Sequence, residues 1–161
     1  MNNLIKPLPP LKSKALDLLA RRDYAYQELL QRLLQYGYDY EEIQIVLNDL
    51  RNKSFINDER YAENLINSKS KRYGSLKIRH LLQQKIADND LVNESLKNNP
   101  TDELATASTL LNRKYRHAPQ NYPEQAKYLR FLLSRGFSSS IALKAIKIAF
   151  SDEETPSDDE Y

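Results

Sequence analysis

The sequence LLSRGF, residues 132–137, joins a pair of leucines to a turn at Gly136, and this arrangement occurs twice earlier in the chain. Leucine pairs also stand at 33–34 and 81–82, and they are followed by turns centred on Gly37 and Lys85. The turn centres are therefore 48 and 51 residues apart. A nearly constant period of about 50 residues is typical of repeat arrays, in which neighbouring units complete each other's cores.

The apolar residues around these turns have helical spacing. In the first unit, leucines at 29, 30, 33 and 34 follow the i, i+1, i+4, i+5 pattern, and Gly37 suits a left-handed helix cap. Asp39 is an expected N-cap, and an apolar stripe from Ile43 to Leu50 follows it. No convincing alternation of period two predicts a strand. We therefore predict an all-α chain of three tandem three-helix units that resemble helix-turn-helix motifs.

The spacing also predicts the segment boundaries. We expect a loose N-terminal leader over residues 1–10, where three prolines disfavour a helix. The three-helix repeats then span residues 11–55, 56–99 and 100–150. Residues 151–161 form an acidic tail that we expect to be disordered.

Composition excludes several classes of protein. The 161 residues include no cysteine, which excludes disulfides and thiolate metal sites, and only three glycines, too few for a phosphate-binding loop. The two histidines lack a surrounding carboxylate pattern for zinc. We find neither a membrane-spanning apolar stretch nor a signal peptide, so we expect a cytoplasmic protein. We also expect no cofactor, no metal site and no catalytic residues.

The net charge of +2 hides an uneven distribution. The tail carries six acidic residues and no basic residue, so the rest of the chain carries a net charge of +8. A basic body predicts contact with a polyanion or an acidic protein surface, and an acidic tail can compete for that contact.

Two basic sets are the candidate contact residues. No acidic residue occurs from Asn64 to Ala87, and in the third unit only Glu124 stands among the cations from Arg113 to Lys147. We expect partner or DNA contacts from Lys69, Lys71, Arg72, Lys77, Arg79, Lys85, Arg113, Lys114, Arg130 and Arg135. If the repeats curve, the two sets can line one concave surface. The alternative is a solvated basic face, and charge alone does not choose between DNA and protein.

Lys85 stands where the other two turns have glycine. If that turn needs a positive φ, a residue with a side chain costs about 1 kcal/mol there. We therefore predict that Lys85→Gly is neutral or stabilising.

Five segments carry a resemblance to a known protein family. They are Ala20-Arg21-Arg22-Asp23-Tyr24 with Glu28-Leu29, Phe55-Ile56-Asn57-Asp58-Glu59-Arg60-Tyr61-Ala62, Lys71-Arg72-Tyr73-Gly74 with Ile78-Arg79 and Leu82, Arg113-Lys114-Tyr115, and Arg130-Phe131-Leu132-Leu133-Ser134-Arg135-Gly136-Phe137. In this order and spacing, over roughly residues 13 to 150, the chain resembles the RecX family of bacterial regulators of the recombinase RecA. It departs from the family at Lys85 (usually Gly), at Asn57 (usually Asp) and at Ala25, which replaces a common helix-capping Ser and leaves Glu28 with half a capping box.

The resemblance implies an elongated, curved molecule that binds in the groove of the RecA–DNA filament and spans neighbouring subunits. It also implies that the protein blocks filament extension and inhibits the ATPase, strand-exchange and co-protease activities of RecA. DNA repair, homologous recombination and the SOS response would be modulated in this way. We expect a monomer whose partners are RecA, its filament and, through the basic face, DNA directly, and no membrane.

Two alternatives remain open at this point. One is a stand-alone helix-turn-helix-like nucleic-acid-binding protein without a recombinase partner, and the other is a generic solenoid scaffold. Sequence-specific operator binding is disfavoured, because no predicted third helix has a cluster of Arg, Asn and Gln suited to base edges.

Overall fold

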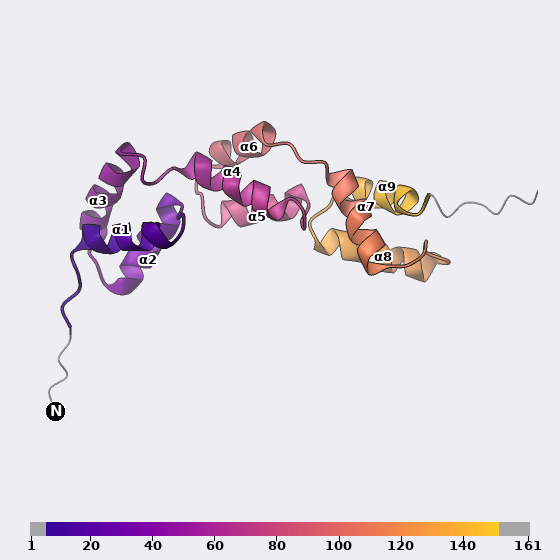
Figure 1. Ribbon diagram of the computed structural model, residues 1–161, viewed down its shortest axis with the longest axis horizontal. Helices are drawn as coiled ribbons and strands as arrows, with labels where there is room; N and C mark the ends of the chain where they lie inside the picture. Colours follow the sequence, from indigo (N-terminus) through magenta and orange to yellow (C-terminus); the bar gives the residue numbers. More distant parts are fainter. Residues whose placement is uncertain (1–5, 152–161) are drawn as a thin grey trace, which may run out of the picture.

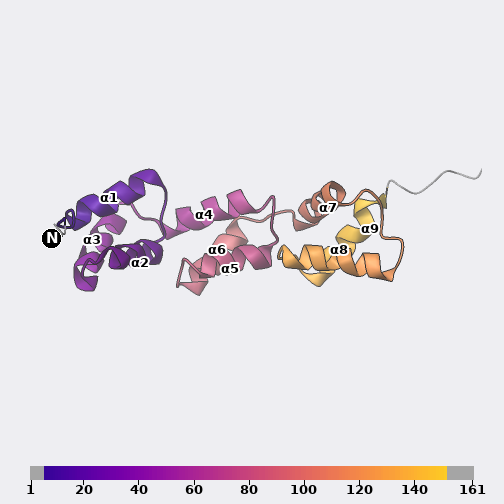
Figure 2. The ribbon, with the colours of Figure 1, turned by 90° about the horizontal axis from the view of Figure 1, so that it is seen from below.

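Residues 6–151 of the computed structural model are described, and they contain nine α-helices and no strand. The helices are α1 (Leu11–Arg21), α2 (Tyr26–Tyr36), α3 (Tyr40–Asn52), α4 (Asp58–Lys69), α5 (Ser75–Gln83), α6 (Asn89–Asn98), α7 (Glu103–Lys114), α8 (Tyr122–Ser134) and α9 (Ser139–Ala149). Figures 1 and 2 show three groups of three helices that follow one another along the long axis. The predicted all-α, elongated array of three-helix units is confirmed.

Each unit has its own apolar core, which is built from the leucine pairs and the stripes around them. The first core includes Leu29, Leu33 and Leu47, and the third includes Leu132 and Phe137. The core of the second unit contains a residue from the first unit, since Ala25 is fully buried among the side chains of α4–α6. The neighbouring units therefore share a core at this junction, as expected for a repeat array.

Two of the three turns end their helices on a glycine with positive φ. Gly37 has φ 101° and Gly136 has φ 88°, and the residue after each glycine donates a backbone hydrogen bond to the leucine five positions earlier. This 6→1 bond is characteristic of the Schellman motif. The left-handed cap predicted at Gly37 is present, and the turn predicted around Gly136 closes in the same way.

The turn at Lys85 is different, because its backbone does not have the positive φ on which the prediction for Lys85→Gly depends. Among the described residues other than glycine, only Ser54 has a positive φ. The backbone N–H of Ile86 donates to the carbonyl of Leu82, which lies four residues earlier rather than five. The turn is therefore one residue shorter, and it closes without a left-handed residue. Leu82, rather than Leu81, takes the fully buried position that Leu33 and Leu132 take in the other units.

The leader is only partly described, because residues 1–5 lie outside the described range. Residues 6–10 form no helix, but the hydroxyl of Tyr38 donates to the carbonyl of Pro9 at 2.6 Å. The Cδ1 atom of Leu8 lies close to Gly37. This part of the leader therefore rests on the first turn. The predicted tail lies outside the described residues from position 152 onward.

Candidate partner-binding surface

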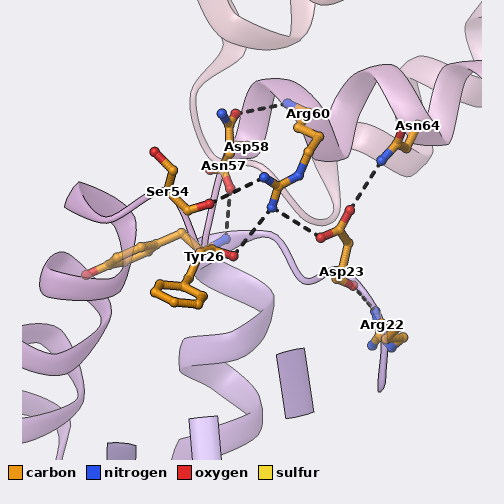
Figure 3. Close-up of polar contacts among 9 residues, drawn as sticks. Arg22, Asp23, Tyr26, Ser54, Asn57, Asp58, Arg60 and Asn64 are labelled. Atoms are coloured by element: carbon orange, nitrogen blue, oxygen red, sulfur yellow. Dashed lines mark hydrogen bonds and ion pairs between the residues drawn. The ribbon is translucent and has the colours of Figure 1, made fainter. Parts of the chain in front are cut away.

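The junction between the first and second units is built around a helix cap supplied from a distance. α2 begins at Tyr26, and the residue before it, Ala25, has no side-chain oxygen with which to cap the helix. Instead, Oδ1 of Asp58, the first residue of α4, accepts the backbone N–H of Tyr26 at 2.8 Å (Figure 3). Asn57 caps α4 itself by accepting from the N–H of Arg60. Adjacent side chains therefore cap helices in two different units.

Burial raises the pKa of the Asp58 carboxyl group above the usual aspartate range, because it desolvates the charged form. The hydrogen bond from the Tyr26 N–H and the charge of Arg51 act in the opposite direction. The desolvation effect is the largest of these. The carboxylate that holds the two units together is thus a group whose charged form is disfavoured by the fold.

A second clamp at this junction is formed by Asp23, in the loop between α1 and α2. Its carboxylate accepts from Nη2 of Arg60 at 3.3 Å and from Nδ2 of Asn64 at 3.2 Å, and both donors lie on α4 (Figure 3). Arg60 also donates to the carbonyls of Ser54 and Phe55. One guanidinium therefore ties α4 to the segment before it and to the first unit.

Glu28 forms a third contact across the junction. Only 8% of its side chain is exposed, and it accepts from Arg22 at 2.6 Å and pairs with Lys85 at 2.9 Å. Lys85 comes from the turn after α5 in the second unit, whereas Arg22 belongs to the first. A candidate contact residue of the sequence analysis is therefore engaged in holding two units together.

The junction between the second and third units repeats the remote cap. Oε1 of Glu103, the first residue of α7, accepts the backbone N–H of Ser75, the first residue of α5, at 2.6 Å. The N-cap position of α5 is Gly74, which has no side chain to offer. In the third unit, α8 is capped by its own Asn121, which accepts from the N–H of Glu124.

Backbone hydrogen bonds strengthen this second junction. The N–H of Gly74 donates to the carbonyl of Arg135 at 2.9 Å, and the N–H of Leu76 donates to the carbonyl of Gly136 at 3.1 Å. A Cβ on Gly136 would lie 2.2 Å from Cβ of Lys77, so only glycine fits there. The two units are thus joined backbone to backbone, which leaves little freedom for one to rotate against the other.

A row of alternating cations and aromatic rings crosses this rigid junction. We call it the cation–aromatic row, and its members in spatial order are Lys77, Tyr73, Arg135, Phe131, Lys114, Tyr115 and Lys127. Each cation lies within 6 Å of a ring centroid, from 4.3 Å for Lys114 over Phe131 to 5.9 Å for Lys114 over Tyr115. Such contacts contribute about 0.5–1 kcal/mol each at exposed sites.

Ring–ring packing fixes the row to the core of the third unit. Tyr115 stacks on Tyr128 with the centroids 3.8 Å apart, and it meets the ring of Phe131 edge-on at 5.9 Å. Burial raises the pKa of Tyr115, and the nearby charge of Arg130 opposes that effect. The rings are half-buried, whereas Lys114 and Lys127 are exposed. The row therefore exposes to solvent positive charges whose positions are fixed by the packed rings.

The cations of the row have no carboxylate partner within the described range. All six ion pairs found there join residues between Lys12 and Lys85. The three carboxylates of the third unit already accept backbone hydrogen bonds. Asp102 caps α7, Glu103 caps α5 of the second unit, and Glu124 accepts from the backbone N–H of Gln120. The row is thus a positive surface left without internal compensation.

The structure separates the ten candidate cations into groups. It brings Lys77, Lys114 and Arg135 into the row. Arg79 points elsewhere and donates to the side chain of Asn93 on α6, and Lys85 pairs with Glu28 at the other junction. The remaining candidates make no ion pair or ring contact within the described range, and they are Lys69, Lys71, Arg72, Arg113 and Arg130.

The ten candidate residues predicted from the sequence include neither the aromatic half of the row nor Lys127, although Lys127 belongs to the second basic set. A signal was available in the i, i+4, i+8 spacing of Lys127, Phe131 and Arg135. Lys127 and Phe131 share one face of α8, and Arg135 directly follows the helix as its C-cap. Tyr73 could not be found in this way, since it joins the row only through the packing of the second unit on the third.

Other kinds of site find no support in the described part of the chain. No group of three or more histidine, cysteine or acidic side chains is placed to hold a metal ion. No helix there is both long enough and apolar enough to cross a lipid bilayer.

Comparison with known proteins gives consistent matches along the chain. Residues 12–50, 57–96 and 101–146 match the first, second and third three-helix domains of RecX. The regulatory protein RecX of Leptothrix cholodnii is 33% identical over 144 residues, which cover 89% of this chain and 92% of that protein. RecX of Neisseria meningitidis serogroup B is 32% identical over 148 residues, covering 92% and 96%. The crystal structure of RecX from Lactobacillus salivarius superimposes with a TM-score of 0.72 at 25% identity, covering 85% of this chain and 92% of that one.

Proposed function

Because this chain belongs to the RecX family of regulatory proteins, we propose that it regulates RecA by binding in the groove of the RecA–DNA filament. Bound there, the protein spans neighbouring subunits and blocks extension of the filament. ATP hydrolysis, strand exchange and repressor co-cleavage by RecA fall as a result, and with them DNA repair by homologous recombination and the SOS response. The chain acts by occupying space and requires no catalytic step of its own.

The observation that carries this proposal is the uncompensated row on a rigid junction. A filament groove is lined by DNA phosphates and by protein, so it attracts a positive surface that is preformed before binding. The backbone bonds of Gly74 and Leu76 hold the two ends of the row in one arrangement before binding. Little conformational entropy is then lost on association.

The most informative experiment follows ATP hydrolysis by RecA during filament growth on single-stranded DNA. We expect the wild-type protein to inhibit hydrolysis at a small ratio of protein to RecA. The triple variant Lys77→Glu, Lys114→Glu and Arg135→Glu should lose at least about tenfold in inhibitory potency, since each reversal replaces attraction by repulsion at a held position. Unchanged hydrolysis at an excess of wild-type protein contradicts the proposal.

A matched control uses cations outside the row. Lys144 and Lys147 are exposed on α9 in the same unit, so the double variant Lys144→Glu and Lys147→Glu alters the net charge without touching the row. We expect this control to inhibit nearly as well as the wild type. An equal loss in both variants would show that overall charge, rather than the row, governs binding.

The row also favours a second candidate function, which is binding of single-stranded nucleic acid without RecA. Rings interleaved with cations offer stacking faces and phosphate contacts together. In that case, binding to an oligothymidylate alone would be tight and would fall steeply with salt, because counterions are released. Filament regulation instead requires that affinity for the RecA-coated strand exceed affinity for the bare strand.

A further inference from the structure

We propose that residues 152–161, which follow the described part of the third unit, bind the cation–aromatic row of the same molecule and compete there with polyanionic partners. The inference deepens the proposed function, on which it rests in taking the row as the partner-binding surface. The occupant is a segment of this chain, and its chemistry is that of an acidic peptide.

Charge complementarity is the first argument. Six of these ten residues are acidic and none is basic, as the sequence DEETPSDDEY shows. The third unit has eight cations and three carboxylates between positions 100 and 151, and the three carboxylates are already engaged by helix caps or by the backbone of Gln120. The nearest stretch of chain thus carries the negative charge that the unit lacks.

The point where the described chain ends is the second argument. Phe150 is 7% exposed, and its ring lies 6.0 Å from that of Tyr128, which stacks at 3.8 Å on Tyr115 of the row. Nζ of Lys127 lies 5.6 Å from the Tyr115 ring, and Nζ of Lys114 lies 5.9 Å from it. Through these contacts, both ammonium groups lie at most about 16 Å from the Phe150 ring, a span that five extended residues cover at about 3.3 Å each.

Tethering makes such a contact favourable even if each charge pair is weak. A segment attached by a short linker meets its site at an effective concentration in the millimolar range. Exposed charge pairs weaken as salt is added, because the Debye length falls to about 8 Å at physiological ionic strength. The intramolecular contact is therefore strongest at low salt, and a polyanion with many charges can displace it.

Zero-length cross-linking with a carbodiimide tests the contact directly, because it joins a carboxylate to an amine only where the two touch. With the full chain at low concentration and low salt, we expect the monomer band to contain cross-links from Asp152–Glu160 carboxylates to Lys114, Lys127 and Lys77. The lysines of the first unit, Lys12, Lys14 and Lys53, serve as internal controls and should remain unlinked to this segment. Cross-links only to lysines outside the row, or none to the row, would overturn the proposal.

Competition is measured with a fluorescein-labelled oligothymidylate of about 20 nucleotides as the polyanion. We expect a chain truncated after Ser151 to bind this probe at least about threefold more tightly than the full chain at low salt, and the gain should shrink as salt is added. A full-length variant with Asn or Gln at the six acidic positions should behave like the truncated chain, which separates charge from length.

The same titration in a row variant excludes a general effect of net charge. In Lys114→Ala with Lys127→Ala, truncation after Ser151 should bring little gain, because the segment has lost its site. An undiminished gain there would refute binding to the row. If truncation changes nothing while charge reversal in the row abolishes inhibition of RecA, the present inference fails and the proposed function stands.

Discussion

Gly74 packs directly on Gly136, and a Cβ placed on Gly74 would lie 2.3 Å from the carbonyl oxygen of Gly136. That carbonyl accepts the N–H of Leu76, so it cannot move away without breaking the hydrogen bond that joins the second and third units. The second junction therefore depends on the absence of one methyl group at each of two positions.

Gly74→Ala should weaken this junction specifically. The backbone of Gly74 has φ −78°, which alanine adopts freely, so the whole effect is steric. We expect a loss of about 1–3 kcal/mol in the free energy of unfolding, as for other overpacked sites. Chemical unfolding followed by circular dichroism measures it, and small-angle scattering should show a change in the length of the molecule.

The control for that variant is Gly37→Ala. Gly37 has φ 101°, but the nearest atom to an added Cβ is Cδ1 of Leu8 at 3.7 Å, which is an ordinary contact. We expect backbone strain alone to lower the free energy of unfolding by about 1 kcal/mol, with no change in the length of the molecule. A change in length for Gly37→Ala, or none for Gly74→Ala, would contradict this account of the junction.

Asp58→Asn should alter how stability depends on pH. Burial raises the pKa of Asp58 in the folded chain, so the folded state holds this proton more tightly than the unfolded state. The contribution of Asp58 to stability is therefore full below the usual aspartate pKa and is lost as pH rises through the raised value. Asparagine can still accept the Tyr26 N–H through Oδ1, but it does not titrate.

Urea unfolding of both proteins between about pH 3 and pH 7 measures this difference. We expect the stability of the wild type relative to Asp58→Asn to fall as pH rises over the lower part of that range, and then to stay level. A constant difference would show that burial does not shift this carboxyl group, and a rising one would show that hydrogen bonding outweighs desolvation.

Lys85→Gly should destabilise the protein, contrary to the expectation from repeat spacing. The turn has no positive φ at this position, so glycine relieves no strain, and the substitution removes the partner of the mostly buried Glu28. We expect a loss of about 1 kcal/mol, since Lys85 is itself partly exposed. Lys85→Met keeps the aliphatic part of the side chain and removes the charge. It should lower the stability measured by thermal unfolding by nearly as much.

A double-mutant cycle with Glu28→Gln isolates the ion pair from other effects of these changes. We expect Lys85→Met to cost less in the Glu28→Gln background than in the wild type, by a few tenths of a kcal/mol or more. Strict additivity would mean that the 2.9 Å contact contributes nothing to stability.

If the chain binds the RecA–DNA filament as proposed, Arg135→Gln should weaken that binding and reduce its salt dependence. The guanidinium is held between Tyr73 and Phe131, so the charge is placed before the partner arrives. If it contacts a phosphate, its loss lowers the slope of log affinity against log salt by about one. Lys144→Gln is the matched control, and an identical slope for both variants would place Arg135 outside the interface.

Local patterns predicted the helices and most of the cores well. The spacing of Leu29 and Leu33 and the glycines at 37 and 136 gave the helix faces and two of the caps, because both depend on neighbours within a few residues. The alanine at position 25 predicts a helix start with only half a capping box. The structure instead supplies Asp58 from 32 residues later. No period in the sequence marks that contact, since it depends on how two units pack.

The candidate site was predicted only in part for the same reason. Basic composition marked Lys77, Lys114 and Arg135, but it could not separate them from Lys85, whose partner Glu28 lies in another unit. The rings of Tyr73 and Phe131 come from different units, and only the packed junction aligns them. Residue type predicted that the surface is positively charged. The unbroken order of cations and rings along the row depends on the tertiary packing and could not be predicted from the sequence.

The borrowed helix caps have a consequence for how such a chain can be cut and recombined. An excised first or second unit would leave the amide of Tyr26 or Ser75 without its acceptor, whereas the third unit carries Asn121 and can stand alone in this respect. The units are therefore not interchangeable cassettes. Their order is fixed by these caps between units. A protein engineer who rearranges the units must therefore move each capping carboxylate together with the helix that it caps.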